Sequence, residues 1–321
     1  MTTAVERRAD PVRLPRAQAG AQPQHLIVTL IGDYWLGRKE HLPSAALVSL
    51  THEFGISSTS ARAALSRLAR RGLLVPSKSG RNTFYGLTPR AEQTLRAGTD
   101  RIFMFGLDAP VRWTGRWVVV IFSVPEEQRD IRHALRSRLR WLGFSSLYDG
   151  VWVSPRPVED EAAEALADLG VHQATVLAAS ASHPRQGEQG HPLSAWNLDE
   201  LRQMYEDFVE EFAPLRDRVR SGQVSASEAL VARTAIMDTW RSFPNRDPEL
   251  PDAMLPSRWP RTEAREIFGQ VYDALGPLAE FRFRQILGHI APELATLVQH
   301  RTAESVVAEV RVARERRADL S

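Results

Sequence analysis

The sequence contains no cysteine among its 321 residues. Disulfide bonds, thiolate nucleophiles, iron–sulfur clusters and thiolate zinc sites are therefore excluded, and the composition fits a reducing cytoplasm. No apolar run approaches the roughly 18 residues of a membrane-spanning helix, so we expect no membrane partner. Residues 1–24 lack the apolar core of a signal peptide and are rich in Arg, Pro, Ala and Gln, which is typical of a disordered tail. The expected location is the cytoplasm.

The sequence also lacks the motifs of several large enzyme classes. It has no G-x-S-x-G elbow, no G-x-x-x-x-G-K-[ST] phosphate loop, no G-x-G-x-x-G turn and no H-E-x-x-H pair. Its nine histidines are scattered without metal-ligand spacing. Adjacent acids such as Glu126 and Glu127 point to different faces of a helix, which makes them poor acid–base pairs. We therefore expect no enzymatic activity, no catalytic residues, no metal site and no cofactor.

Lysine is scarce, because it occurs only at positions 39 and 78, and nearly all basic side chains are arginine. The formal net charge of +2 does not by itself indicate a nucleic-acid partner. The charge is unevenly distributed, however, since residues 61–101 carry nine basic and two acidic side chains, and residues 199–211 are acidic. Codon bias and solvated helix faces are the alternative explanation for any single arginine. As a group, the basic cluster favours an anionic partner.

Three parts of the chain differ in pattern, and together they predict a multidomain α+β protein. Residues 25–98 predict short helices followed by a hairpin. Residues 110–182 predict strands that alternate with helices in the order β-α-β-β-α-β, which is typical of a ferredoxin-like domain. Residues 193–310 predict a helical C-terminal domain.

The first of these parts predicts a winged helix-turn-helix. Gly55 permits a sharp turn before a third helix, which Ser57 is placed to cap and Gly72 to end. In that helix the apolar residues share one stripe, so the opposite face must be exposed. The stripe consists of Ala61, Ala64, Leu65 and Leu68.

The exposed face of this helix carries small, hydroxyl and guanidinium side chains, which permit close approach to a major groove. A hairpin with its turn at Ser79-Gly80 follows and predicts a wing. The candidate DNA-binding residues are Ser57, Ser58, Thr59, Arg62, Ser66, Arg67, Arg70, Lys78 and Arg81. A solvated amphipathic helix and a protein-docking winged helix remain as alternatives.

The C-terminal part contains helical patterns around residues 198–212, 227–240, 261–275 and 278–289. A proline-rich connection, FPNRDPELPDAMLPSRWP, lies between two of them. Such a segment is stiff, so it either braces helices or lines a pocket.

The motifs RWTGRWVVVIFSVPEEQ and WRSFPNRDPELPDAMLPSRWP, together with the winged helix, resemble the PaaX-type transcriptional repressors of phenylacetic-acid catabolism. The resemblance extends from about His25 to beyond Leu275. It implies a homodimeric repressor that binds a palindromic double-stranded DNA operator and is released by phenylacetyl-CoA or a related acyl-CoA effector. An activator or dual regulator with a different effector, and a docking scaffold that does not bind DNA, are the alternatives.

Two positions depart from the family pattern, Asp238 where a histidine is usual and Arg261 where a glycine is usual. Both change the charge of the region that the resemblance assigns to sensing, so the identity of the effector stays open. A CoA ligand needs cations for its phosphates and apolar walls for its acyl group. The candidate effector-binding residues are Arg233, Arg241 and Arg265 for the first, and Trp240, Phe243 and Trp259 for the second. A core anchor is the alternative for each tryptophan, and residues 97–100 are expected to act as a hinge during release.

The middle segment is also similar to the small ferredoxin-like nuclease subunit of CRISPR adaptation complexes. That family places a metal-binding Asp at the end of its first strand. Here the strand ends Phe122-Ser123-Val124, without a carboxylate. The resemblance therefore implies the fold and not the nuclease chemistry.

Overall fold

The structure, a computed structural model, describes residues 22–107, 113–181 and 191–318. The predicted disordered tail lies outside the described residues except at its end, where residues 23 and 24 are helical. The chain forms two compact units from non-consecutive segments. The first contains residues up to 104, residues 211–240 and residues from 266 onward, and the second contains residues 105–210 and 241–265.

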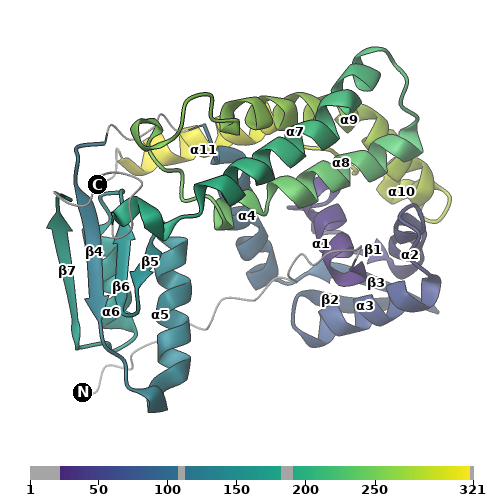
Figure 1. The fold of residues 1–321 in the computed structure, drawn as a ribbon. Helices are drawn as coiled ribbons and strands as arrows, with labels where there is room; N and C mark the ends of the chain where they lie inside the picture. The colour runs from purple at the N-terminus through teal and green to yellow at the C-terminus, as the bar shows by residue number, and fades with distance from the viewer. Residues whose placement is uncertain (1–21, 108–112, 182–190, 319–321) are drawn as a thin grey trace, which may run out of the picture. The chain divides into compact units, whose positions relative to one another are not determined.

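The first unit begins with three helices, a small antiparallel sheet and a fourth helix (Figure 1). The strand order is β1-β3-β2, and Ser79 pairs with Asn82, so Gly80 and Arg81 make a two-residue hairpin turn. Gly80 adopts a φ of 58°, which glycine tolerates without strain. The elements are α1 (Pro23–Tyr34), β1 (Leu42–Pro43), α2 (Ser44–His52), α3 (Ser58–Arg70), β2 (Leu74–Ser79), β3 (Asn82–Leu87) and α4 (Pro89–Met104).

Local signals set both ends of α3. The Ser57 hydroxyl accepts a hydrogen bond from the backbone N–H of Ser60 at 3.3 Å, and Gly72 ends the helix with a φ of 69°. The predicted apolar stripe is buried, with exposed fractions of 0–1%, and packs against α1 and α2. The apolar stripe on one side of α3 therefore leaves its arginine-rich side facing solvent.

The expected hinge at residues 97–100 is wrong, because α4 runs through them without interruption. The hydroxyl of Thr88 accepts a hydrogen bond from the N–H of Ala91 at the start of this helix. Phe103 and Met104 are buried at its end, with exposed fractions of 3% and 4%. The hydrogen bond at the start of the helix and the buried side chains at its end outweigh the roughly 1 kcal/mol that Gly98 costs inside a helix.

The remaining helices, which belong wholly or partly to the first unit, come from the C-terminal half of the chain. One of them, α9, is continuous over 28 residues where the sequence pattern predicts two helices separated before Leu278. Pro277 removes one backbone donor, but Phe268, Leu275 and Phe283 on either side of it are all buried without measurable exposure. The bounds are α7 (Leu198–Arg220), α8 (Ala226–Trp240), α9 (Arg261–Gly288), α10 (Pro292–Ala295) and α11 (Ala303–Ala318).

The second unit is built on a four-stranded antiparallel sheet with the order β5-β6-β4-β7 (Figure 1). Helices α5 and α6 pack on one face of it, where Val120, Leu135 and Leu139 are fully buried. On the other face Trp117 and Val153 pack with Leu193, Leu250 and Met254. Its elements are β4 (Trp117–Phe122), α5 (Arg129–Trp141), β5 (Ser145–Tyr148), β6 (Val151–Ser154), α6 (Glu159–Asp168) and β7 (Ala174–Ala179).

The proline-rich connection belongs to this second unit and contains short 3₁₀ turns at Phe243–Asn245 and Asp252–Met254. In the described part of the chain, no helix is both long enough and apolar enough to cross a bilayer.

Candidate functional site

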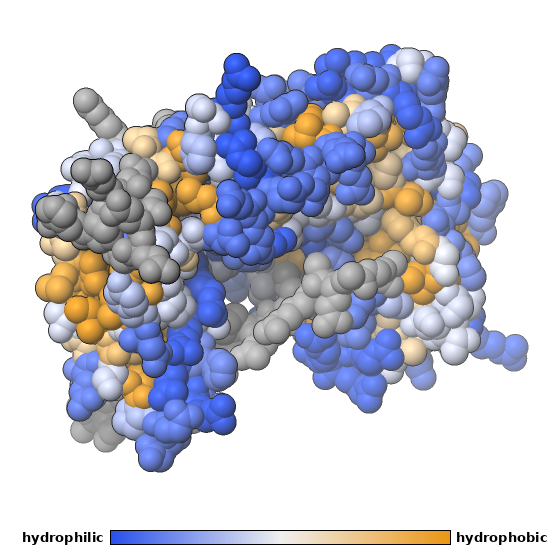
Figure 2. Space-filling model, in the orientation of Figure 1, coloured by the Kyte–Doolittle hydropathy of each residue, from blue (hydrophilic) through white to orange (hydrophobic). Residues whose placement is uncertain are grey.

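The outer face of α3 and the β2–β3 hairpin form an exposed basic surface in the first unit. Figure 2 shows hydrophilic side chains over α3. Ser58 is half-buried and its hydroxyl lies 2.8 Å from Nε2 of His52. The exposed members are Ser57, Thr59, Arg62, Ser66, Arg67, Arg70, Lys78 and Arg81.

In the part of the chain that the structure describes, the cations of this basic surface form no ion pairs with acidic side chains. Helix α3 contains three arginines and no acidic residue. Among the described residues, no acidic side chain pairs with Arg62, Arg67 or Arg70 on α3, nor with Lys78 or Arg81 on the hairpin. These five exposed cations are thus available to an anionic partner. Such a surface attracts a polyanion and holds its phosphates.

Two of the six predicted effector residues, Arg233 and Trp240, lie in the core of the first unit. The side chain of Arg233 is fully buried, and it donates hydrogen bonds to the carbonyl oxygens of Tyr272 at 3.1 Å and Arg301 at 2.6 Å. Its guanidinium carbon lies 3.7 Å from the centre of the Tyr272 ring, and its Nη1 lies 3.8 Å from Oδ2 of Asp33. Burial opposes its charge, but Tyr272, Tyr34 and Asp33 raise its pKa above the usual value. Arg233 therefore joins α1, α8 and α9 as a core cation.

Trp240 is also part of this core. Its ring stacks on Phe268 with the centres 4.8 Å apart, and its indole N–H donates to the carbonyl of Ile102 at 3.2 Å. The other four candidates, Arg241, Phe243, Trp259 and Arg265, belong to the second unit. Arg233 and Trp240 are thus assigned to one compact unit and the remaining candidates to the other.

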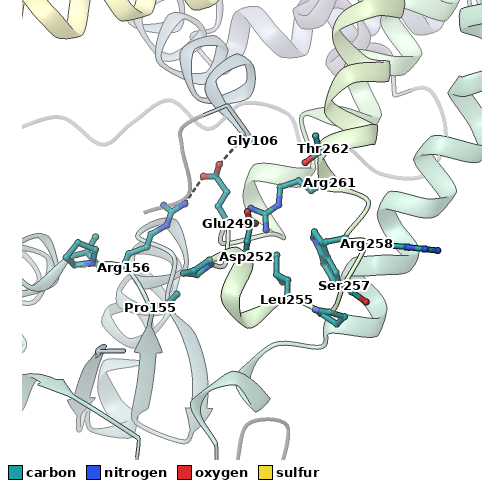
Figure 3. A pocket seen from close by; sticks show the side chains of 15 residues that line it. Gly106, Pro155, Arg156, Glu249, Asp252, Leu255, Ser257, Arg258, Arg261 and Thr262 are labelled. Atoms are coloured by element: carbon teal, nitrogen blue, oxygen red, sulfur yellow. Dashed lines mark hydrogen bonds and ion pairs between the residues drawn. The ribbon is translucent and has the colours of Figure 1, made fainter. Parts of the chain in front are cut away.

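A pocket of about 620 Å³ opens in the second unit. It is lined by Gly106, by residues 155–158 in the turn after β6, by Glu249, and by residues 251, 252, 255–259, 261 and 262. Figure 3 shows the carboxylate of Glu249 between Gly106 and the guanidinium of Arg156, while the side chain of Arg258 extends away from them. The volume suits a small organic ligand.

Two of the residues that line this pocket form an ion pair, and one of them has a strained backbone. Arg156 donates from Nη2 to Oε2 of Glu249 at 2.6 Å, and the backbone N–H of Gly106 donates to Oε1 at 2.9 Å. Glu249 and Arg258 have φ values of 57° and 56°, and within the described chain they are the two non-glycine residues with positive φ. Backbone strain of this kind is concentrated at binding sites.

A buried network next to the pocket holds the proline-rich loop in place. Tyr205 donates its hydroxyl to Asp247 at 2.6 Å, and Nε of Arg261 lies 3.3 Å from the same carboxylate oxygen. Arg261 also donates to the carbonyl of Leu250 at 3.0 Å. Burial, followed by the charge of Asp247, raises the pKa of Tyr205 well above its usual value. Arg261, which departs from the family pattern, is therefore a brace of the loop that lines the pocket.

Of the predicted effector residues, the pocket includes Trp259 alone. Sequence reasoning missed Arg156, Glu249 and Arg258. The proline-rich segment, whose stiffness suits a bracing or lining role, was a signal for Glu249 and Arg258, and no signal pointed to Arg156. No group of three or more His, Asp or Glu side chains that could hold a metal ion occurs in the part of the chain that the structure describes.

Comparison with protein families matches three consecutive regions of the chain. Residues 22–91 match "PaaX-like protein", residues 110–191 match "PaaX protein central Cas2-like domain", and residues 196–285 match "PaaX-like protein C-terminal domain". The chain belongs to the PaaX family. The basic face of α3 thus lies in the N-terminal PaaX region, and Glu249 to Thr262 lie in the C-terminal one.

A curated relative and a solved structure extend these matches. The chain is 25% identical over 260 residues to "Transcriptional repressor PaaX" of Escherichia coli K12, covering 79% of this chain and 80% of that protein. It is also similar in fold to "Uncharacterized protein Rv0674 from Mycobacterium tuberculosis", with a TM-score of 0.52 and 22% identity, covering 80% of this chain and 96% of the other. The fold described here is therefore similar to that of one solved chain.

Proposed function

We propose that this PaaX family member is a sequence-specific transcriptional repressor of an aromatic-acid catabolic pathway of the phenylacetate type. The curated relative is a transcriptional repressor by name, and the match to this chain covers four-fifths of the relative's length. The observation that carries the proposal is the basic face of α3, which is exposed and free of acidic side chains. A helix with small, hydroxyl and arginine side chains fits the major groove, where arginine reads guanine.

The N-terminal region is proposed to act as a winged helix-turn-helix. Helix α3 enters the major groove, and the β2–β3 hairpin is the wing that brings Lys78 and Arg81 to the phosphates. The protein binds as a homodimer to a palindromic operator, with half-sites about one helical turn apart or a multiple of it. The strand order β5-β6-β4-β7 supports a ferredoxin-like fold for the middle region.

Release is proposed to follow binding of phenylacetyl-CoA or a related acyl-CoA in the cytoplasm, and the protein performs no chemistry on this effector. The effector shifts the dimer toward a form whose recognition helices no longer match the operator. Because coupling between two binding sites is reciprocal, operator DNA must weaken effector binding by the same factor.

Fluorescence anisotropy of the purified full-length protein tests the proposal. The ligands are duplexes from the protein's own upstream region, titrated at two salt concentrations with and without phenylacetyl-CoA. We expect tight binding that falls steeply with salt and is abolished by the thioester. Tight binding indifferent to the thioester would point to a regulator with another effector. The absence of saturable DNA binding would leave only the docking scaffold.

A further inference from the structure

In the pocket of the second unit, a carboxylate of the protein is bound by two hydrogen-bond donors that could also bind an anionic ligand. Glu249 accepts hydrogen bonds from the guanidinium of Arg156 at 2.6 Å and from the backbone N–H of Gly106 at 2.9 Å. A guanidinium together with a backbone N–H is a typical recognition element for carboxylate and phosphate oxygens. The donors would serve a bound ligand as well as they serve Glu249.

We propose that Glu249 is an internal competitor in a ligand pocket, and that an anionic organic ligand binds there by replacing its carboxylate on Arg156 and Gly106. The proposal rests on the effector-responsive function given above and names the group of the protein that the effector displaces. It assigns the anion-binding donors to residues outside the six that the sequence predicted.

Partial exposure allows this exchange. The side chains of Arg156 and Glu249 are 32% and 27% exposed, so the ion pair faces the pocket and can open without disrupting the core. A pair at this level of exposure contributes little net stability, because water competes for both charges. Its replacement by a ligand anion therefore carries a small energetic penalty.

The backbone of Glu249 is strained. A φ of 57° costs a non-glycine residue roughly 1 kcal/mol, and the contacts of the folded chain must offset that cost. The neighbouring Asp247 supplies one of these contacts, because its carboxylate accepts the backbone N–H of Glu249 at 2.6 Å. Asp247 thus holds the strained backbone of Glu249 in place, while Glu249 lines the pocket.

The other arginines of the pocket are less suited to the exchange. Arg261 is 12% exposed and is committed to Asp247 and to the carbonyl of Leu250. Arg258 is exposed and its side chain extends away from Glu249 (Figure 3). Arg156 is thus the pocket cation whose partner a ligand can replace, and Arg258 is left at the rim for a second anionic group.

Isothermal titration calorimetry of the full-length protein with phenylacetyl-CoA, and with free CoA as a second probe, tests the proposal. In Glu249→Gln the side chain keeps its shape but loses the competing charge, so we expect phenylacetyl-CoA to bind about threefold to fivefold more tightly. Arg156→Gln should weaken binding about tenfold or more. The matched control is Glu200→Gln, which removes the carboxylate of an exposed pair with Arg246 in the same unit, at 2.8 Å, and should leave binding unchanged.

The double variant Glu249→Gln, Arg156→Gln separates competition from a general change of charge. The gain of Glu249→Gln should vanish when Arg156 is absent, because there is then no cation for which to compete. Unchanged or weaker binding by Glu249→Gln, or no saturable binding by any variant, would overturn the proposal. Circular dichroism establishes that each variant is folded.

DNA binding measured without ligand in the same variants keeps this proposal distinct from the repressor function. If the wild-type protein binds no operator, the repressor function fails, but the order of the calorimetric affinities still decides the role of Glu249. If DNA binding is normal and the affinities do not change, only the competitor role fails.

Discussion

Arg282 of α9 donates two hydrogen bonds to Glu53, from Nε to Oε2 at 3.0 Å and from Nη2 to Oε1 at 2.8 Å. Ser227 of α8 adds a third to Oε2 at 2.5 Å. Glu53 directly follows α2 and lies in the turn before α3. Residues far along the chain thus fix the turn that orients the basic helix. The hydrogen bonds from Arg282 hold the pKa of the Glu53 carboxyl below its usual value, although partial burial opposes them.

Replacing Glu53 by glutamine should lower the free energy of unfolding by about 1.5–3 kcal/mol, the usual range for a hydrogen bond to a charged group. Because the folded-state pKa is depressed, the stabilisation is present above the unfolded-state pKa of glutamate and is lost as pH falls through the folded value. Urea denaturation should therefore separate Glu53→Gln from wild type at pH 7 and bring them together in acid. The control is Glu315→Gln on the exposed face of α11, and a loss of equal size there would argue against a role for the pair.

Arg62 and Arg81 should differ in how their removal affects DNA binding. Arg62→Ala on α3 should weaken the free energy of DNA binding by about 1–3 kcal/mol and relax the preference for one base, if its guanidinium reads a guanine. Arg81→Ala at the hairpin turn should weaken all sequences alike and reduce the salt slope by about one. Anisotropy with operator and single-base variant duplexes over a salt series measures both, with Arg311→Ala on α11 as the control. Equal, sequence-blind losses from both changes would remove the direct-readout assignment.

The parts of the fold that local chemistry decides could be predicted from the sequence. Ser57 caps α3, Gly72 ends it, and its apolar stripe is buried as its 3.6-residue spacing indicates. The exposed basic face follows directly from that stripe. The surface of the candidate DNA site could therefore be predicted almost completely.

The parts that distant contacts decide could not be predicted. Pro277 would end an isolated helix, but buried side chains on both sides of it keep α9 continuous. Arg233 looks like a ligand cation in the sequence, whereas its partners Asp33 and Tyr272 lie 200 residues before and 39 residues after it. Arg156 and Glu249 are 93 residues apart and meet only in the folded chain. No local pattern encodes such a pocket.

The cap of α3 gives a third prediction. Ser57→Ala should reduce the free energy of unfolding by about 0.5–2 kcal/mol, because the N–H of Ser60 loses its acceptor. Ser66→Ala on the exposed side of the same helix should cause no loss, since alanine is the better helix former and nothing is left unpaired. Urea denaturation of both variants checks this pair. A greater loss for Ser66→Ala would contradict the assignment of Ser57 as the cap.

The buried tyrosines predict a loss of stability in alkali. Burial raises the pKa of Tyr34 to about 12, and it raises the pKa of Tyr272 and Tyr205 in the same direction. An unfolded tyrosine has a pKa of about 10, so between these values the unfolded chain releases a proton that the folded chain retains. The stabilisation is thus complete below pH 10, and it falls as pH rises toward 12, by about 1.4 kcal/mol per pH unit for each such group.

Urea denaturation followed by tryptophan fluorescence from pH 8 to 11.5 measures this dependence. Tyr34→Phe removes one titrating group and should make the alkaline fall shallower by the contribution of one proton. Tyr148→Phe is the matched control, because that ring is 56% exposed and its hydroxyl already meets water in the folded state. A Tyr34→Phe curve parallel to wild type above pH 10 would show that the Tyr34 phenol ionises equally in both states, and that the core formed by α1, α8 and α9 does not exclude the phenolate.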